Sequence, residues 1–193
     1  MDSLFETLYD ILFQPIIGMR NMAKGKNVGQ ALVAFSLSIL IPILALYFGL
    51  KATGMSTMIQ VMIVLKIFGS VVLWVMGAAI WHLIAEFFGG QGSARGLFTA
   101  LGFAHVPRIF IVPLWALITF FPENSKTLLM TIGVLVVMLW SLFLDVVAIK
   151  EVYQLSTPQA VLVFITPLLV MGILCVICFT LIGSSLTHMP MWL

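Results

Sequence analysis

Among the ionisable side chains inside or at the edge of long apolar segments, where charge is costly, five could come together. They are His82, Glu86, His105, Arg108 and Asp145. An Arg or Asp at the centre of a membrane helix costs about 2.5–3.5 kcal/mol, so we expect these groups to face other helices or the membrane surface. Together they could form a polar cluster with one of three roles: a charge-balanced network that holds helices in register, a site for a ligand or lipid headgroup, or a path for protons or ions.

Metal chemistry is disfavoured by the number of available ligands. His82 and Glu86 have the one-turn spacing of a helical metal site, but a zinc centre needs three or four ligands. Only His105 or Asp145 could complete such a set. No nucleophile with an evident base stands out in the aqueous loops. We therefore expect no metal, no cofactor and no enzymatic activity.

The glycines that follow Glu86 also have a structural explanation. Gly89, Gly90 and Gly92 surround Gln91, but the segment lacks the Lys-Ser/Thr ending and the preceding strand of a phosphate-binding loop. Glycine adopts positive φ without steric cost, so these residues are expected to form a tight turn between two helices.

Small residues recur every four positions on both sides of this turn. The two stripes are Ala78, His82, Glu86 and Gly90, then Gly96, Ala100, Ala104 and Arg108. Such stripes let helices in a membrane approach closely, so we expect the second and third spans to meet along them. Pro107 removes one backbone hydrogen bond and is expected to kink the third span. A shallow course of residues 93–104 would raise Arg108 toward the headgroups.

Composition sets the class of protein that must position these residues. Of the 193 residues, 62% are hydrophobic and 8% are charged, whereas soluble domains have about 45–50% and 25%. The chain is therefore an integral membrane protein. Its net charge of +2 is too small and too scattered to indicate nucleic acid as a partner. Cys175 and Cys178 lie on one face of an apolar run and are expected to be small packing residues, with a redox or metal role as the weaker alternative.

Five apolar runs are long enough to cross a bilayer. They cover residues 30–50, 59–88, 97–121, 127–148 and 159–182. The short connections force neighbouring helices to be antiparallel, which predicts an all-α fold, a compact bundle of five transmembrane helices. We expect residues 1–29 to form an N-terminal segment, 30–182 the membrane domain and 183–193 a short tail. Ser156 or Thr157 is expected to cap the last span.

The basic residues near the span ends predict the orientation. Arg20, Lys24, Lys26, Arg95 and Lys150 fall on one side, and Lys51 and Lys126 on the other. The positive-inside rule then places the N-terminus in the cytoplasm and the tail outside. Because Asp2, Glu6 and Asp10 replace the basic start of a signal peptide, we expect the N-terminus to be retained.

An amphipathic segment precedes the first span. Its apolar residues recur at intervals of three and four, with Glu6 and Asp10 on the other side and Pro15 at the end: Leu4, Phe5, Leu8, Ile11 and Leu12. This pattern predicts a short helix at the membrane interface, and a helix packed beneath the bundle is the alternative.

Several short motifs, in this order, resemble the Yip domain family, the Ypt-interacting proteins. They are Pro15 ahead of the first span, Gly89-Gly90-Gln91-Gly92-Ser93, Gly102-Phe103-Ala104 leading to Pro107, and the segment Lys150 to Ala160. The likeness covers nearly the whole chain. It implies five spans with a cytoplasmic N-terminus and, in eukaryotic relatives, binding of prenylated Rab-type GTPases in traffic between the endoplasmic reticulum and the Golgi.

The chain departs from the eukaryotic pattern at its N-terminus. In place of a long extension with an Asp-Leu-Tyr-Gly-Pro motif, it has Tyr-Asp-Ile-Leu-Phe-Gln-Pro at residues 9–15. It is more similar to the short prokaryotic branch, whose biochemical role the resemblance leaves undefined. A Rab-type partner follows from family analogy alone. The expected location is the cell (inner) membrane of a prokaryote, or the endoplasmic reticulum or Golgi membrane of a eukaryote.

Two functions remain open. The leading hypothesis is a non-enzymatic membrane module that binds or organises membrane proteins or lipids through its cytoplasmic face. The alternative is a small transporter or lipid-translocating protein that uses Glu86, Arg108 and Asp145 as a polar path. Many transporters contain an inverted repeat, but none is visible and five spans cannot divide into equal halves, which disfavours the alternative.

Overall fold

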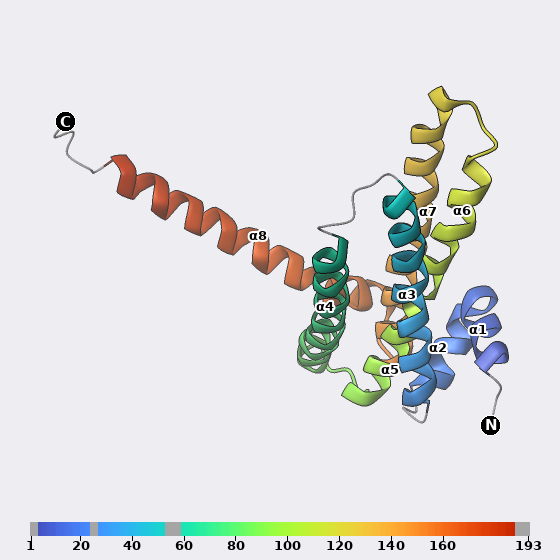
Figure 1. Cartoon of the computed structure of the whole chain (residues 1–193). Coiled ribbons are helices and arrows are strands. Elements are labelled where there is room, and N and C mark those ends of the chain that lie inside the picture. The colour runs from blue at the N-terminus through green and yellow to red at the C-terminus, as the bar shows by residue number, and fades with distance from the viewer. Residues whose placement is uncertain (1–3, 24–26, 53–58, 188–193) are drawn as a thin grey trace.

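Five helical segments in the computed structural model are long and apolar enough to span a membrane (Figure 1). The structure describes residues 4–23, 27–52 and 59–187, and this part of the chain contains helices and no strand. The spanning segments lie in α3 (Val28–Ala52), α4 (Ile59–Phe87), the run of α5 (Ala94–Ala104), η1 (Val106–Phe110) and α6 (Ile111–Ile118), α7 (Glu123–Tyr153) and α8 (Thr157–Thr187). The predicted all-α, five-span architecture is confirmed.

The third span is broken at the predicted position. Helix α5 ends at Ala104, and the chain then forms the 3-10 turn η1, which contains Pro107, before α6 begins at Ile111. Proline has no backbone N–H and cannot continue the hydrogen bonding of the preceding helix. The break places Arg108 on a short irregular turn in the middle of a membrane-spanning segment.

The connection between the last two spans is shorter than predicted. Residues 149–158 were expected to be a loop, but α7 continues to Tyr153 and α8 begins at Thr157. Gln154 ends α7 in the left-handed conformation, with φ of 55°. Ser156 donates to Gln159 Oε1 from its backbone N–H at 3.0 Å and from its hydroxyl at 2.7 Å. This side-chain contact stabilises the first turn of α8.

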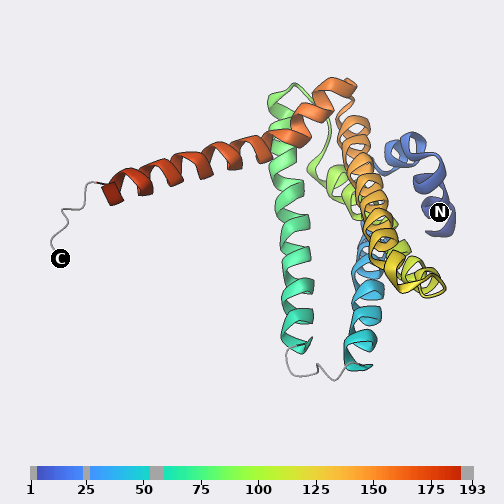
Figure 2. The same cartoon turned by 90° about the horizontal axis from the view of Figure 1, so that it is seen from above.

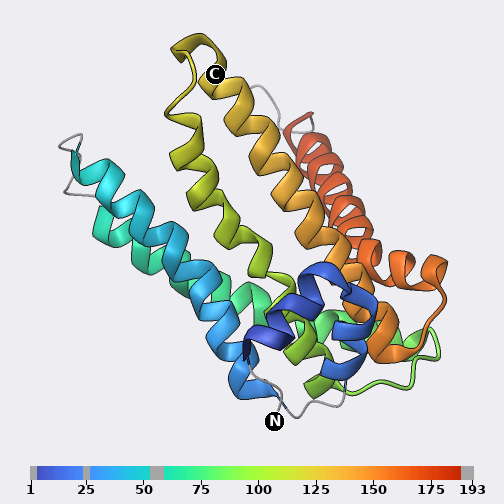
Figure 3. The same ribbon diagram turned by 90° about the vertical axis from the view of Figure 1, so that its right-hand side faces the viewer.

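The N-terminal segment forms two helices, α1 (Leu4–Phe13) and α2 (Pro15–Met22), that lie across one end of the bundle (Figure 3). Thr7 and Ile11 of α1 are buried, whereas Phe5 and Phe13 are 82% and 70% exposed. The helix therefore packs on the bundle through one side, as in the alternative prediction, and presents an aromatic side outward.

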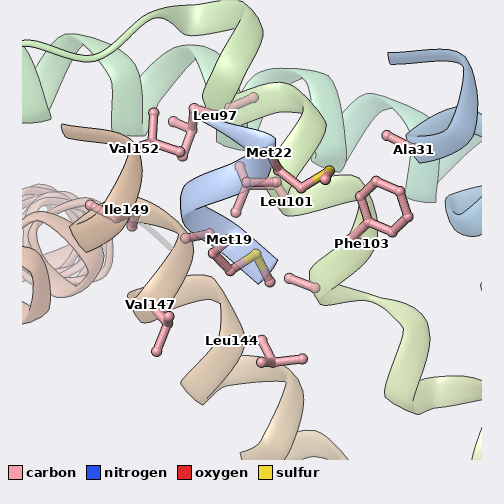
Figure 4. Close-up of a cluster of buried hydrophobic side chains, with 14 of the residues drawn as sticks. Met19, Met22, Ala31, Leu97, Leu101, Phe103, Leu144, Val147, Ile149 and Val152 are labelled. Atoms are coloured by element: carbon pink, nitrogen blue, oxygen red, sulfur yellow. The ribbon is translucent and has the colours of Figure 1, made fainter. Parts of the chain in front are cut away.

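Helix α5 lies at the centre of the fold and contacts α2, α3, α4 and α7. From Gly96 to Ala104, every residue except Phe98 is buried. Figure 4 shows Leu97 and Leu101 of α5 among Met19 and Met22 of α2 and the buried side chains of α7. The second and third spans do meet, since Trp74 of α4 stacks on Phe98 with ring centroids 3.9 Å apart. This contact is not along the predicted small-residue stripes, because Gly90 lies against Tyr153 and Gly96 against the Ala23 carbonyl.

Helix α8 differs from the expected compact bundle. Its first turns contact α4 and α7, and the rest of the helix runs away from the other spans (Figures 1 and 2). Ala160 and Val163 are fully buried, but only 6% of the apolar window of α8 is buried. Cys175 and Cys178 lie in this outer part and are exposed, so they are not the packing residues that were predicted.

The topology brings the basic residues Arg20, Arg95 and Lys150 to the end of the bundle that carries α2 and the start of α5, while Lys126 lies near the start of α7. Lys24 and Lys26, which contributed to the predicted orientation, lie outside the described residues. The cytoplasmic location of the N-terminus stays a prediction. Residues 183–187 of the predicted tail belong to α8, and residues 188–193 are also outside the described part.

Candidate functional site

A groove of about 460 Å³ opens where α8 diverges from α4. Its walls are apolar and aromatic: Leu73, Trp74, Gly77, Ile80 and Trp81 of α4, and Phe164, Pro167 and Leu168 of α8 are among the lining residues. The polar part of the lining comes from the broken third span and from α7. It consists chiefly of His105, Arg108 and Asp145. The groove therefore combines apolar walls with charged groups of opposite sign.

The charged groups in this groove are not fully paired. Asp145 is only 5% exposed, and its Oδ1 has no hydrogen-bond partner among the described residues. Arg108 Nε and Ser141 Oγ are also buried without a partner in this part of the chain. Arg108 and Asp145 attract each other electrostatically, yet no direct ion pair between them occurs among the described residues. Because buried polar groups are almost always hydrogen-bonded, this arrangement is unusual.

His105 is held in place by its own helix. Its Nδ1–H donates to the carbonyl oxygen of Leu101 at 2.8 Å. The imidazole ring meets the Phe35 ring edge-on, with centroids 5.2 Å apart. The bond to a carbonyl requires the proton on Nδ1, so Nε2 is the ring nitrogen that remains for other contacts.

His82 and Glu86 do not line the groove. Instead, His82 Nδ1 lies 2.6 Å from the hydroxyl of Tyr153, and its Nε2 lies 3.5 Å from Glu86 Oε1. Successive residues of a helix point about 100° apart, so Trp81 can face α8 while His82 faces the end of α7. The five predicted residues are therefore divided between the groove and a second polar group beside Tyr153.

The glycine turn covers this second group. Gly89 has φ of +82°, as the predicted turn requires. A Cβ atom at Gly90 would come within 2.8 Å of Tyr153 Cβ, and one at Gly92 within 2.6 Å of the Val152 carbonyl oxygen. The backbone N–H of Gln91 donates to the Tyr153 carbonyl at 3.4 Å. The glycines thus serve close packing over Tyr153 as well as the turn itself.

Some residues that define this region were not predicted. Arg20 of α2 binds the buried Glu151 of α7, with Nη2 and Oε2 2.8 Å apart and the Nε–H donating to the same oxygen at 2.9 Å. Glu151 and Tyr153 both lie in the Lys150 to Ala160 motif, which is the sequence feature that could have identified them. Ser141 precedes Asp145 by one helical turn on α7. Nothing in the sequence indicates that Arg20, 131 residues away, is the partner of Glu151.

A larger cavity of about 830 Å³ lies between α6 and α7. Lys126 is the charged residue in its lining, and its ammonium is paired with Glu123 Oε1 at 2.6 Å. Since this charge has its partner, the smaller groove is the better candidate site. Within the described residues, no three His, Cys, Asp or Glu side chains are arranged to hold a metal ion.

Comparison with protein-family models matches residues 9–179 to the Yip1 domain. The matched region runs from α1 into α8 and includes the glycine turn, the break at Pro107 and the whole groove lining. No curated protein and no solved structure matches the chain.

Proposed function

This chain belongs to the Yip1 domain family of membrane proteins, and on that premise we propose that it is a non-enzymatic module that binds membrane components in the groove between α4 and α8. The family match, which the motifs predicted, and the five apolar helices make it an integral, multi-pass membrane protein. In the proposed role, it organises a protein or lipid of the same membrane near the end of the bundle that carries α2.

One observation carries the proposal: Asp145 and Arg108 line the groove with buried polar atoms that have no partner among the described residues. A buried unsatisfied polar group costs about 1–3 kcal/mol, and a charged one costs more. Charged residues inside membrane helices commonly mark binding or transport sites. A bound component that supplied the missing hydrogen bonds would recover this cost.

A crosslinking experiment tests the proposal. A photoreactive amino acid at Leu73, which lines the groove and is 74% exposed, is compared with the same group at Leu83, which is on the same helix, outside the groove and 67% exposed. After irradiation of intact membranes, we expect a discrete adduct at position 73 whose yield falls in Asp145→Asn. Equal adducts at both positions, or an adduct at 73 that Asp145→Asn leaves unchanged, would refute the proposal.

The depth of the charged residues favours a second candidate, lipid translocation. Asp145 precedes Glu151 by six positions on α7, which is about 9 Å along the helix axis. A polar group bound at Asp145 would therefore lie deeper in the membrane than the Arg20–Glu151 ion pair. Scrambling of a fluorescent lipid in proteoliposomes, dependent on Arg108, would support this function, whereas scrambling no faster than in protein-free liposomes would exclude it.

A further inference from the structure

We infer that the groove recognises a phospholipid whose headgroup carries both a phosphate and a primary ammonium, with the phosphate at Arg108 and the ammonium at Asp145. This inference rests on the proposed function, because it names the component that the groove binds. It follows from the charges of the two groups, the chemistry of the walls and the position of the opening.

The charges of Arg108 and Asp145 require a ligand with one negative and one positive group. Arg108 offers a buried N–H donor at Nε, and Asp145 offers a buried acceptor at Oδ1. A guanidinium matches phosphate oxygens in both charge and geometry. A simple anion would leave Asp145 unsatisfied beside a like charge, and a simple cation would do the same to Arg108. A zwitterion satisfies both groups and leaves the site neutral.

The walls leave few other polar groups for a ligand. The Trp74 indole N–H donates to the Phe98 carbonyl at 3.2 Å, and the Trp81 indole N–H donates to the Phe164 carbonyl at 3.3 Å. Both indole donors are therefore already paired, and the buried Trp74 ring is also stacked on Phe35 and Phe98. The charged groups that recognise the headgroup are consequently Arg108 and Asp145, with His105 Nε2 as a neutral polar neighbour, while the aliphatic walls suit hydrocarbon.

The size and opening of the groove fit a lipid. Its volume of about 460 Å³ lies within the range of about 300–1,000 Å³ that is typical of small-molecule sites. Leu73 of α4 and Leu168 of α8 line opposite walls and are 74% and 66% exposed, so apolar surface continues outward on both sides. A lipid could enter sideways between the diverging helices and leave its acyl chains along these surfaces.

The inference predicts a ranking of headgroups. Phosphatidylethanolamine has a phosphate and N–H donors on its ammonium. Phosphatidylcholine keeps the charge but has no N–H to give to Asp145, and phosphatidylglycerol has no cation at all. One charge-assisted hydrogen bond corresponds to a preference of about tenfold or more. We therefore expect phosphatidylethanolamine to bind at least about tenfold more tightly than the other two.

The full-length protein in phosphatidylcholine nanodiscs provides the test. Phosphatidylethanolamine or phosphatidylglycerol is added in steps, and the lipids retained by the released protein are counted by native mass spectrometry. Asp145→Asn should abolish the preference for phosphatidylethanolamine over phosphatidylcholine while it keeps binding of phosphatidylcholine, which also shows that the variant is folded. Arg108→Gln should weaken all three lipids. Lys126→Gln, in the cavity between α6 and α7, is the matched control and should behave as the unmodified protein.

Several results would overturn the inference. Equal retention of the three lipids, or a preference that survives Asp145→Asn, would remove the headgroup assignment even where the Leu73 adduct shows that the groove is occupied. Displacement of the bound lipid by soluble phosphoethanolamine would assign the site to a free zwitterion. Absence of any retained lipid would mean that water alone satisfies Arg108 and Asp145. Absence of the Leu73 adduct from the protein with Asp145 and Arg108 intact, in contrast, counts against the proposed function itself.

Discussion

Replacing Gly92 by alanine would push a methyl group into the end of α7. The added Cβ would lie 2.6 Å from the Val152 carbonyl oxygen and 2.7 Å from Tyr153 Cδ1, closer than real Cβ contacts allow. The carbonyl belongs to the backbone of a helix and cannot swing aside, so either the turn lifts away or the Tyr153 ring moves. Tyr153 is 1% exposed, which leaves its ring little space to move.

The expected loss has two parts. Inserting a methyl group into a well-packed site costs about 1–3 kcal/mol. Displacement of Tyr153 would also break its 2.6 Å contact with His82, and a hydrogen bond contributes about 0.5–1.5 kcal/mol. We therefore expect Gly92→Ala to lower the free energy of unfolding by about 2–4 kcal/mol. For a chain of this length that corresponds to a fall in Tm of roughly 5–15 °C.

Thermal unfolding of the purified protein in detergent, followed by tryptophan fluorescence, measures this effect. Gly69→Ala is the matched control, because a Cβ at Gly69 of α4 meets nothing within 4 Å and alanine favours a helix over glycine by about 0.8–1.0 kcal/mol. Tyr153→Phe separates the hydrogen bond from the packing. If Gly92→Ala unfolds at the same temperature as Gly69→Ala, the close packing of the glycine turn on Tyr153 is wrong.

Three further changes test other contacts. Arg20→Gln should lower the free energy of unfolding by about 1–3 kcal/mol, because it leaves the buried Glu151 without its charged partner. Chemical unfolding measures this loss, and the loss should persist at a salt concentration that screens exposed charges. Trp81→Phe removes the indole donor to the Phe164 carbonyl while it keeps an aromatic ring, so faster cleavage of α8 by a protease in detergent is expected, and an unchanged rate would show that this bond does not hold α8. Pro107→Ala restores a backbone N–H in η1 and should let α5 lengthen, which moves the groove floor. That variant should lose the photo-adduct of the groove without a fall in Tm, and retention of the adduct would show that the break does not position the site.

Only part of the candidate site could be predicted from the sequence. Charges inside apolar runs are rare because they are expensive, so Arg108 and Asp145 could be found by inspection. Which groups they meet could not, because this depends on how each helix is rotated about its axis. His82 lies next to Trp81 in the sequence, yet it contacts Tyr153 while Trp81 lines the groove. Arg20 could not be assigned to Glu151 for the same reason.

The number of spans, the turn at Gly89 and the break at Pro107 were determined by the sequence alone, because each depends on local properties: the length of an apolar run, a positive φ and a missing N–H. The divergence of α8 and the division of the polar residues were decided only by the tertiary structure. Hydropathy measures the transfer of a segment from water into lipid. Once the helix is in lipid, a neighbouring helix is no more apolar than an acyl chain, so hydropathy does not indicate which faces pack together. Steric fit and hydrogen bonds such as Trp81 to Phe164 make that choice.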